Sequence, residues 1–134
     1  MPVRINREKQ TDLFKKYTIT WTPTIVILDG EGKEHYRFTG FLPPSEFSAA
    51  IILQGAKTEV DLQNFDLAIK CFNEVIDKYK GSVSVPEAIF YLFVAKYLST
   101  HDAKNLRAGF DRLTEEFPGS EWTLKATPYK LIDK

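Results

Sequence analysis

The spacing of apolar residues changes near residue 44, from short strand-like runs to the longer period of helices. Residues 25–28 are apolar at every position, which is typical of a strand that is covered on both faces. Residues 35–39 alternate instead, as on a strand with one wet face. Because residues 29–32 supply aspartate and two glycines, the pattern predicts an antiparallel hairpin.

Further elements are expected on both sides of this hairpin. Before it, weak alternation predicts a short strand over residues 2–6, and one apolar face predicts a helix over residues 10–17. After it, Pro44 and Pro86 fit the first turns of helices. The apolar stripes predict four helices, which begin at Pro44, Phe65, Pro86 and just after Asp102.

The second and fourth of these helices repeat each other. Phe72 and Phe110 align at a separation of 38 positions, and the same shift pairs Gly81 with Gly119. Residues 46–127 resemble tetratricopeptide (TPR) repeats, which are helix-turn-helix units of about 34 residues. In that family small residues let the two helices of a repeat approach each other. Ala56, Ala68 and Phe72 match the pattern in the first repeat, whereas the second keeps Ala95 and Phe110 but has Leu106 at the other small position.

The segment Trp21-Thr22-Pro23-Thr24 places a proline directly before the apolar strand. This step resembles the proline loop of thioredoxin-like proteins, where the proline is cis and lies beside a redox-active cysteine pair. The order strand, helix, proline loop, hairpin and closing helix resembles the C-terminal half of such a domain. The chain has a single cysteine, Cys71, so the redox chemistry of that family is not carried over to it.

These two resemblances give the predicted fold class. We expect an α+β protein with a truncated thioredoxin-like α/β unit followed by an all-α TPR-like region. The first unit is predicted over residues 1–55 and the second, with about two helix pairs, over residues 46–134. The two units share a junction helix, because nothing between Pro44 and Val60 resembles a linker.

Charge and composition exclude several function classes. Eighteen basic and eighteen acidic side chains give a formal net charge of zero, so no overall field attracts nucleic acid or an anionic membrane. The longest apolar runs are far shorter than the roughly 20 residues of a transmembrane helix. The N-terminus has no secretory signal, which predicts a cytoplasmic protein, or an envelope protein if another segment precedes this sequence.

No residue pattern predicts catalysis, a metal site or a cofactor. His35 and His101 are isolated in the sequence and have no neighbour at ligand spacing. Nothing near Cys71 in the sequence would lower the pKa of its thiol, so we interpret it as a small side chain of a helix. We therefore expect no enzyme activity from the chain as given.

The function predicted from the sequence is a non-catalytic protein-interaction or scaffold module. Candidate partner contacts are Trp21, Thr22 and Pro23 in the proline loop, and Lys57 and Lys96 beside the small residues of the repeats. The alternative is a C-terminal fragment of a thioredoxin-like thiol-disulfide oxidoreductase whose Cys-x-x-Cys segment lies outside this chain. A protein or peptide partner of unknown identity follows from the first reading.

The strand at residues 25–28 also predicts association. In the thioredoxin-like sheet another strand lies between it and the strand expected at residues 2–6. Without that neighbour its apolar edge invites pairing. Either the N-terminal segment moves inward to cover the edge, or two chains form a homodimer, which we favour.

Overall fold

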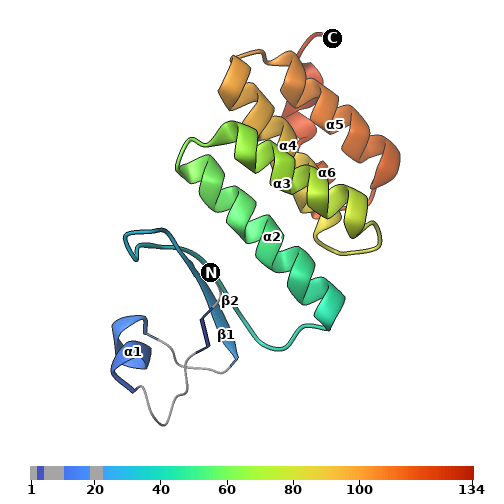
Figure 1. Cartoon of the computed structure of the whole chain (residues 1–134). Helices are drawn as coiled ribbons and strands as arrows, with labels where there is room; N and C mark the ends of the chain where they lie inside the picture. Colours follow the sequence, from blue (N-terminus) through green and yellow to red (C-terminus); the bar gives the residue numbers. More distant parts are fainter. Residues whose placement is uncertain (1–2, 5–10, 19–22) are drawn as a thin grey trace. The chain divides into compact units, whose positions relative to one another are not determined.

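The computed structural model describes residues 3–4, 11–18 and 23–134. The chain divides into two compact units, Met1–Phe41 and Leu42–Lys134, and each is described by itself (Figure 1). The predicted strand over residues 2–6 is not formed at Val3 and Arg4, where the side chain of Val3 is 75% exposed. The other positions of that predicted strand lie outside the described residues.

The first unit contains a short helix and the predicted hairpin. Helix α1 is Thr11–Lys16, and strands β1 (Thr24–Leu28) and β2 (Glu34–Thr39) pair in antiparallel register. Ile25 lies opposite Phe38 and Ile27 lies opposite Tyr36. The antiparallel hairpin predicted from the apolar pattern is therefore confirmed.

Asp29 organises the turn of this hairpin. Its Oδ1 accepts hydrogen bonds from the backbone N–H groups of Glu31 (2.9 Å) and Lys33 (3.0 Å). Its Oδ2 lies 3.0 Å from Nε2 of His35, whose side chain is 6% exposed. One carboxylate thus satisfies two turn amides and joins the turn to β2, which is a common role of aspartate in turns.

Arg37 joins β2 to the end of α1. Its guanidinium donates hydrogen bonds to the backbone oxygens of Tyr17 (2.7 Å) and Thr18 (3.4 Å), just beyond the last turn of the helix. A cation at a helix C-terminus is favourable because the last carbonyls have no partner within the helix. The backbone oxygen of Pro23 accepts from the N–H of Gly40 at 2.8 Å, so the chain is also fixed where it enters and leaves the hairpin.

The four long helices of the second unit lie side by side in chain order, each antiparallel to the one before (Figure 1). Helix α2 spans the whole segment from Pro44 to Val60 without a break. The elements are α2 (Pro44–Asp61), α3 (Phe65–Lys78), α4 (Val85–Thr100), α5 (Lys104–Glu116), α6 (Glu121–Lys125) and the 3-10 helix η1 (Thr127–Leu131).

The hydrophobic core lies where α2, α3, α4 and α5 meet. Small residues on adjacent helices, Ala56 on α2 and Ala68 on α3, are fully buried there. Burial of large apolar side chains is the main favourable term in folding, and it explains why the helical stripes were visible in the sequence. The largest buried side chains are Leu53, Phe72, Val75, Ile89, Leu92 and Leu113.

The two helical hairpins repeat the same backbone geometry at a spacing of 38 residues. Gln63, between α2 and α3, and His101, between α4 and α5, both adopt positive φ, at 63° and 58°. Tyr79 and Phe117, which follow α3 and α5, have similar backbone angles (φ −124°, ψ 47° and φ −139°, ψ 60°). Positive φ is uncommon for residues other than glycine, so its recurrence at equivalent turns is a specific match.

The loops that follow α3 and α5 match as well. Ser82 Oγ accepts from the N–H of Ser84 at 3.0 Å, and Ser120 Oγ accepts from the N–H of Trp122 at 3.1 Å. In the first loop Glu46 of α2 adds two contacts, because its carboxylate accepts from the hydroxyl of Ser82 (2.7 Å) and from the N–H at position 83 (3.3 Å). The two loops therefore share a serine-to-backbone contact at the same spacing of 38 residues.

The close approach within the second hairpin differs from the sequence expectation. A Cβ atom at Gly109 would lie 2.8 Å from Cβ of Phe93, so α4 and α5 approach each other closely at these two residues. We expected Ala95 and Leu106 to occupy the equivalent positions. Ala95 is buried, but Leu106 is only partly buried, and the glycine that permits the approach lies three residues further along α5.

The elements α6 and η1 were not predicted. Helix α6 contacts α4 and α5, as α4 contacts α2 and α3, so it stands in the place of the first helix of a third hairpin. Arg107 of α5 holds the C-terminal end of η1 and the residue after it, because its guanidinium donates hydrogen bonds to the backbone oxygens of Lys130 (2.6 Å) and Ile132 (3.1 Å). Pro128, in the first turn of η1, has no N–H with which to extend the α-helical ladder of α6.

Candidate functional site

Lys57 of α2 reaches across to α4. Its Nζ lies 2.9 Å from Oε1 of Glu87 and 4.7 Å from the ring centre of Tyr91, and the residue is only 8% exposed. A partly buried ammonium group needs such a carboxylate, and the face of an aromatic ring adds a cation–π contribution. The predicted contact residue Lys57 therefore forms part of the packing between two helices.

Tyr91 also contacts Trp122 of α6. Its ring centre lies 5.6 Å from that of Trp122, and Nζ of Lys125 lies 4.0 Å from the ring centre of Trp122. Burial, with the negative charge of Glu87 as a smaller cause, raises the pKa of the Tyr91 hydroxyl above its usual value. The result is a lysine–aromatic face, which we define as Lys57, Glu87, Tyr91, Trp122 and Lys125.

Lys96 does not belong to this face. It lies nine positions after Glu87 on the same helix, which is two and a half turns, so the two side chains leave α4 on opposite sides. Its Nζ lies 4.8 Å from the ring centre of Phe93 on its own helix. The structure therefore does not bring Lys57 and Lys96 together. The 38-residue spacing explains why, because it pairs Lys57 with Ala95 rather than with Lys96.

The proline loop is only partly described. Trp21 and Thr22, both predicted contact residues, lie outside the described residues. Pro23 is exposed, and its backbone oxygen is held by the N–H of Gly40. Thr24 follows directly as the first residue of β1. The predicted role of Pro23 at the entrance to the strand fits this position.

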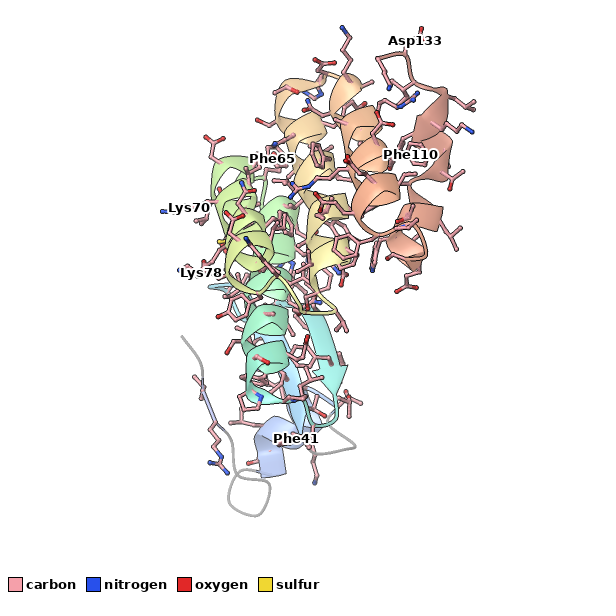
Figure 2. The ribbon with its side chains drawn as sticks, turned by 90° about the vertical axis from the view of Figure 1, so that its right-hand side faces the viewer. Phe41, Phe65, Lys70, Lys78, Phe110 and Asp133 are labelled. Atoms are coloured by element: carbon pink, nitrogen blue, oxygen red, sulfur yellow. The ribbon has the colours of Figure 1, made fainter. Side chains whose placement is uncertain are left out.

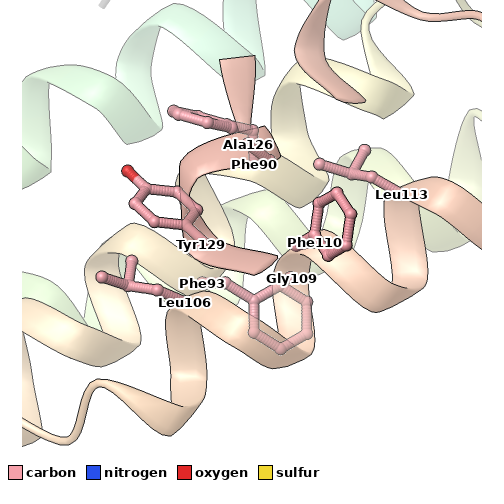
Figure 3. Close-up of a pocket in the computed structure, with 8 residues that line it drawn as sticks. All are labelled: Phe90, Phe93, Leu106, Gly109, Phe110, Leu113, Ala126 and Tyr129. Carbon is pink, nitrogen blue, oxygen red and sulfur yellow. The ribbon is translucent and has the colours of Figure 1, made fainter. Parts of the chain in front are cut away.

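An aromatic crevice lies between α4, α5 and η1, but it is filled. Figure 3 shows the side chain of Phe93 beside Gly109, and the crevice has no room for a water molecule. Such a dense interior is packing rather than a ligand pocket. Its lining residues are Phe90, Phe93, Leu106, Gly109, Phe110, Leu113, Ala126 and Tyr129.

The surroundings of Cys71, Asp29 and His35 show the state of these reactive side chains. Burial, followed by the negative charges of Glu74 and Glu59, raises the pKa of the Cys71 thiol, so the less nucleophilic protonated form is favoured. Asp29 and His35 form a pair, but their hydrogen bonds serve the hairpin turn. Among the residues that the structure describes, no group of three histidine, cysteine, aspartate or glutamate side chains could hold a metal ion.

Sequence reasoning missed four members of the lysine–aromatic face. Glu87 is 30 positions from Lys57, and no local pattern connects them. The 38-residue repeat held a usable signal, since it pairs Glu87 with Lys125 and Tyr91 with Tyr129. Extending the repeat beyond the fourth predicted helix would have drawn attention to Trp122 and Lys125.

The comparisons with known proteins concern the N-terminal part. A family model for a thioredoxin-like domain matches residues 2–54, which run from the N-terminus into α2. Neither the search of curated proteins nor the search of solved structures found a match. In the described part of the chain no helix has both the length and the apolar character to cross a membrane. The chain thus carries a thioredoxin-like domain over residues 2–54.

Proposed function

We propose that this chain is a non-catalytic protein-interaction module, in which a thioredoxin-like part is joined to a TPR-like helical repeat. The observation that carries the proposal is the repeated geometry of the two helical hairpins. The positive φ values at Gln63 and His101, 38 residues apart, support a repeat of one structural unit. Helical hairpins that stack in this way offer extended surfaces for protein partners.

The lysine–aromatic face is the proposed binding surface of this repeat. It draws on α2, α4 and α6, the first helices of successive hairpins, which line the groove in the TPR family. Tyrosine and tryptophan are also over-represented among the residues that contribute most to binding energy. Lys125 and the half-buried Trp122 offer a positive charge beside an apolar ring, which suits a peptide with a carboxylate next to an apolar side chain.

Further contacts in the thioredoxin-like part are proposed on the basis of the sequence. Trp21, Thr22 and Pro23 would contact a partner peptide, as the proline loop does in thioredoxin-like proteins. Lys96 would contact a partner from the other side of α4. A homodimer through the edge of β1 is a separate proposal, and measurement of mass in solution by light scattering tests it.

Site-specific photo-crosslinking in the organism that makes the protein tests the proposed function. A photoreactive amino acid replaces Lys125 on the lysine–aromatic face or, as the matched control, Lys78 on α3. Figure 2 shows Lys70 and Lys78 projecting outward from α3. We expect one discrete protein adduct from position 125, identified by mass spectrometry, and none from position 78. Equal adducts from both positions, or none from either, would contradict the proposal.

The second candidate function is that of a fragment of a thiol-disulfide oxidoreductase. The match of residues 2–54 to a thioredoxin-like domain favours it, because such domains are often oxidoreductases. Two cysteines are required to cycle between a dithiol and a disulfide, and residues 1–134 contain one. The reactive pair would therefore have to come from outside these residues, while this chain would supply contacts to the substrate protein.

A further inference from the structure

A depression lies at the end of the first helical hairpin. It is formed by the turn between α2 and α3, the first residues of α3, and the end of α4, and its volume is about 600 Å³. It is open to solvent, unlike the aromatic crevice. We call it the turn depression. The residues that line it are Gln63, Asn64, Phe65, Asp66, Leu67 and Ser99.

Hydrogen bonds fix the backbone of this turn. The N–H of Asn64 donates to the backbone oxygen of Glu59 at 2.8 Å, and the side-chain amide of Asn64 donates to the carboxylate of Glu59 at 2.7 Å. The N–H of Gln63 donates to the backbone oxygen of Val60 at 3.0 Å. A partner would meet a preformed surface and would not have to order this turn on binding.

Exposed leucines occur in the turn depression and at chain positions next to its lining residues. Leu67 lines it and is 48% exposed, while Leu62 and Leu98, each adjacent in the chain to a lining residue, are 44% and 36% exposed. A single exposed leucine is ordinary on a protein surface. The exposed side chain of Leu67 in an open depression offers an apolar contact to a partner, and exposed apolar surface often marks a site of interaction.

The charges nearest in the sequence to the lining residues are mostly negative, although Lys70 lies one turn after Asp66 on α3 and Lys104 lies two positions after Asp102. Residues 59–67 contain Glu59, Asp61 and Asp66, and residues 98–102 end in Asp102, whereas neither stretch contains a lysine or an arginine. Asp66 lines the depression itself and is exposed. The net charge of the whole chain is zero, so this acidic surface is a local feature. It favours positively charged partners and disfavours nucleic acids and anionic membranes.

We propose that the turn depression docks a basic amphipathic segment of a partner protein. An apolar side chain of that segment would enter the depression beside Leu67, and its lysine or arginine residues would pair with Asp66 and the neighbouring carboxylates. Apolar burial supplies affinity, and the complementary charges supply orientation and a faster encounter. This surface shares no residue with the lysine–aromatic face, and it prefers a partner of opposite charge to the carboxylate peptide proposed for that face.

A binding measurement with the full chain tests the proposal. The probe is a fluorescent 18-residue helical peptide (about five turns) of leucine and lysine, and its control carries glutamate in place of lysine. Fluorescence anisotropy should show binding of the basic peptide only, and that binding should weaken as salt is added. Vesicles of anionic lipid should not bind.

Two charge reversals on the same helix locate the site. Asp66→Lys should weaken binding about fivefold or more, because one contact between unit charges at 4 Å in water is worth about 1 kcal/mol. Asp77→Lys is the matched control, since Asp77 is also exposed on α3 but lies about 16 Å further along the axis. Its effect should be clearly smaller than that of Asp66→Lys, because Asp77 does not line the depression.

A polar substitution separates the apolar contact from the charge. Leu67→Ser should weaken binding of the basic peptide while leaving its salt dependence unchanged, because Leu67 is half-exposed and the substitution removes no charge. The proposal is overturned if the acidic peptide binds equally well, if Asp66→Lys and Asp77→Lys have the same effect, or if the basic peptide does not bind. A loss of binding in Lys125→Glu with none in Asp66→Lys would assign the peptide to the lysine–aromatic face and would also overturn it.

Discussion

Gly109 allows α4 and α5 to approach each other, and adding one methyl group tests this. In Gly109→Ala the new Cβ would lie 2.8 Å from Cβ, 3.0 Å from Cγ and 3.1 Å from Cδ2 of Phe93. Real Cβ contacts are rarely so short, and Cβ of Phe93 is fixed to its helix. The ring and the helix therefore have to move together, in a region where Gly109 itself is buried.

The size of the effect follows from two opposing terms. Overpacking in a dense core costs about 1 to 3 kcal/mol. Alanine gains about 1 kcal/mol over glycine inside a helix. We expect Gly109→Ala to lower the free energy of unfolding by up to about 2 kcal/mol. In the control Gly55→Ala, nothing lies within 4 Å of the new Cβ, so the helix term alone should stabilise α2 by about 0.5 to 1 kcal/mol.

Urea unfolding followed by far-UV circular dichroism measures both variants. A second substitution, Phe93→Ala, should recover part of the loss in the Gly109→Ala protein, because it removes Cγ and Cδ2, two of the three atoms that the methyl group meets. In the wild-type background the same substitution should be destabilising, since it leaves space in the core. If Gly109→Ala stabilises the protein as much as Gly55→Ala does, the close approach of α4 and α5 is wrong.

Three further predictions concern other parts of the chain. Ala68→Leu should destabilise the helical unit by about 1 to 3 kcal/mol, because Ala68 is fully buried where α3 packs; an unchanged urea midpoint would argue against this packing. The hydrogen bond with His35 holds the pKa of the Asp29 carboxyl below its ordinary 3.8, so its stabilisation of the hairpin is complete above that pH and is lost as pH falls through the lower folded value. Asp29→Asn should remove this acid dependence from the NMR shifts of the hairpin amides, and an unaltered pH profile would refute it. The purified chain should not accelerate the reduction of insulin by dithiothreitol, because Cys71 has no second cysteine with which to cycle, and turnover that depends on Cys71 would contradict this.

Much of the fold could be predicted because its determinants are local. The hairpin of β1 and β2 follows from four apolar residues, a turn with two glycines, and an alternating strand. Helices α2 to α5 follow from apolar stripes with the helical period, bounded by prolines in two cases. Helix α6 and η1 are too short to show a period, and Pro128 interrupts them.

The candidate site was predicted less well because it depends on distant pairs. Lys57 was selected, but its contacts with Glu87 and Tyr91 depend on how α4 packs against α2. Lys96 was selected through Ala95, which is one position away from the 38-residue equivalent of Ala56, and a one-residue shift turns a helix by about 100°. Trp122 was not selected, because no expected element contained it.

The interaction proposal depends on the helical part being two copies of one hairpin, and the turn residues Gln63 and His101 test this most directly. A residue other than glycine loses about 1 to 2 kcal/mol of folding free energy in the left-handed conformation, and substitution by glycine removes this strain. Glycine is also more flexible in the unfolded chain, and this opposing term costs about 0.5 to 1 kcal/mol. Gln63→Gly and His101→Gly should therefore each raise the free energy of unfolding, by about 0.5 to 1 kcal/mol. Leu62→Gly, at a residue with φ of −85°, should lower it. Urea unfolding of the three variants should show two gains and one loss, whereas opposite signs for Gln63→Gly and His101→Gly would contradict the repeat.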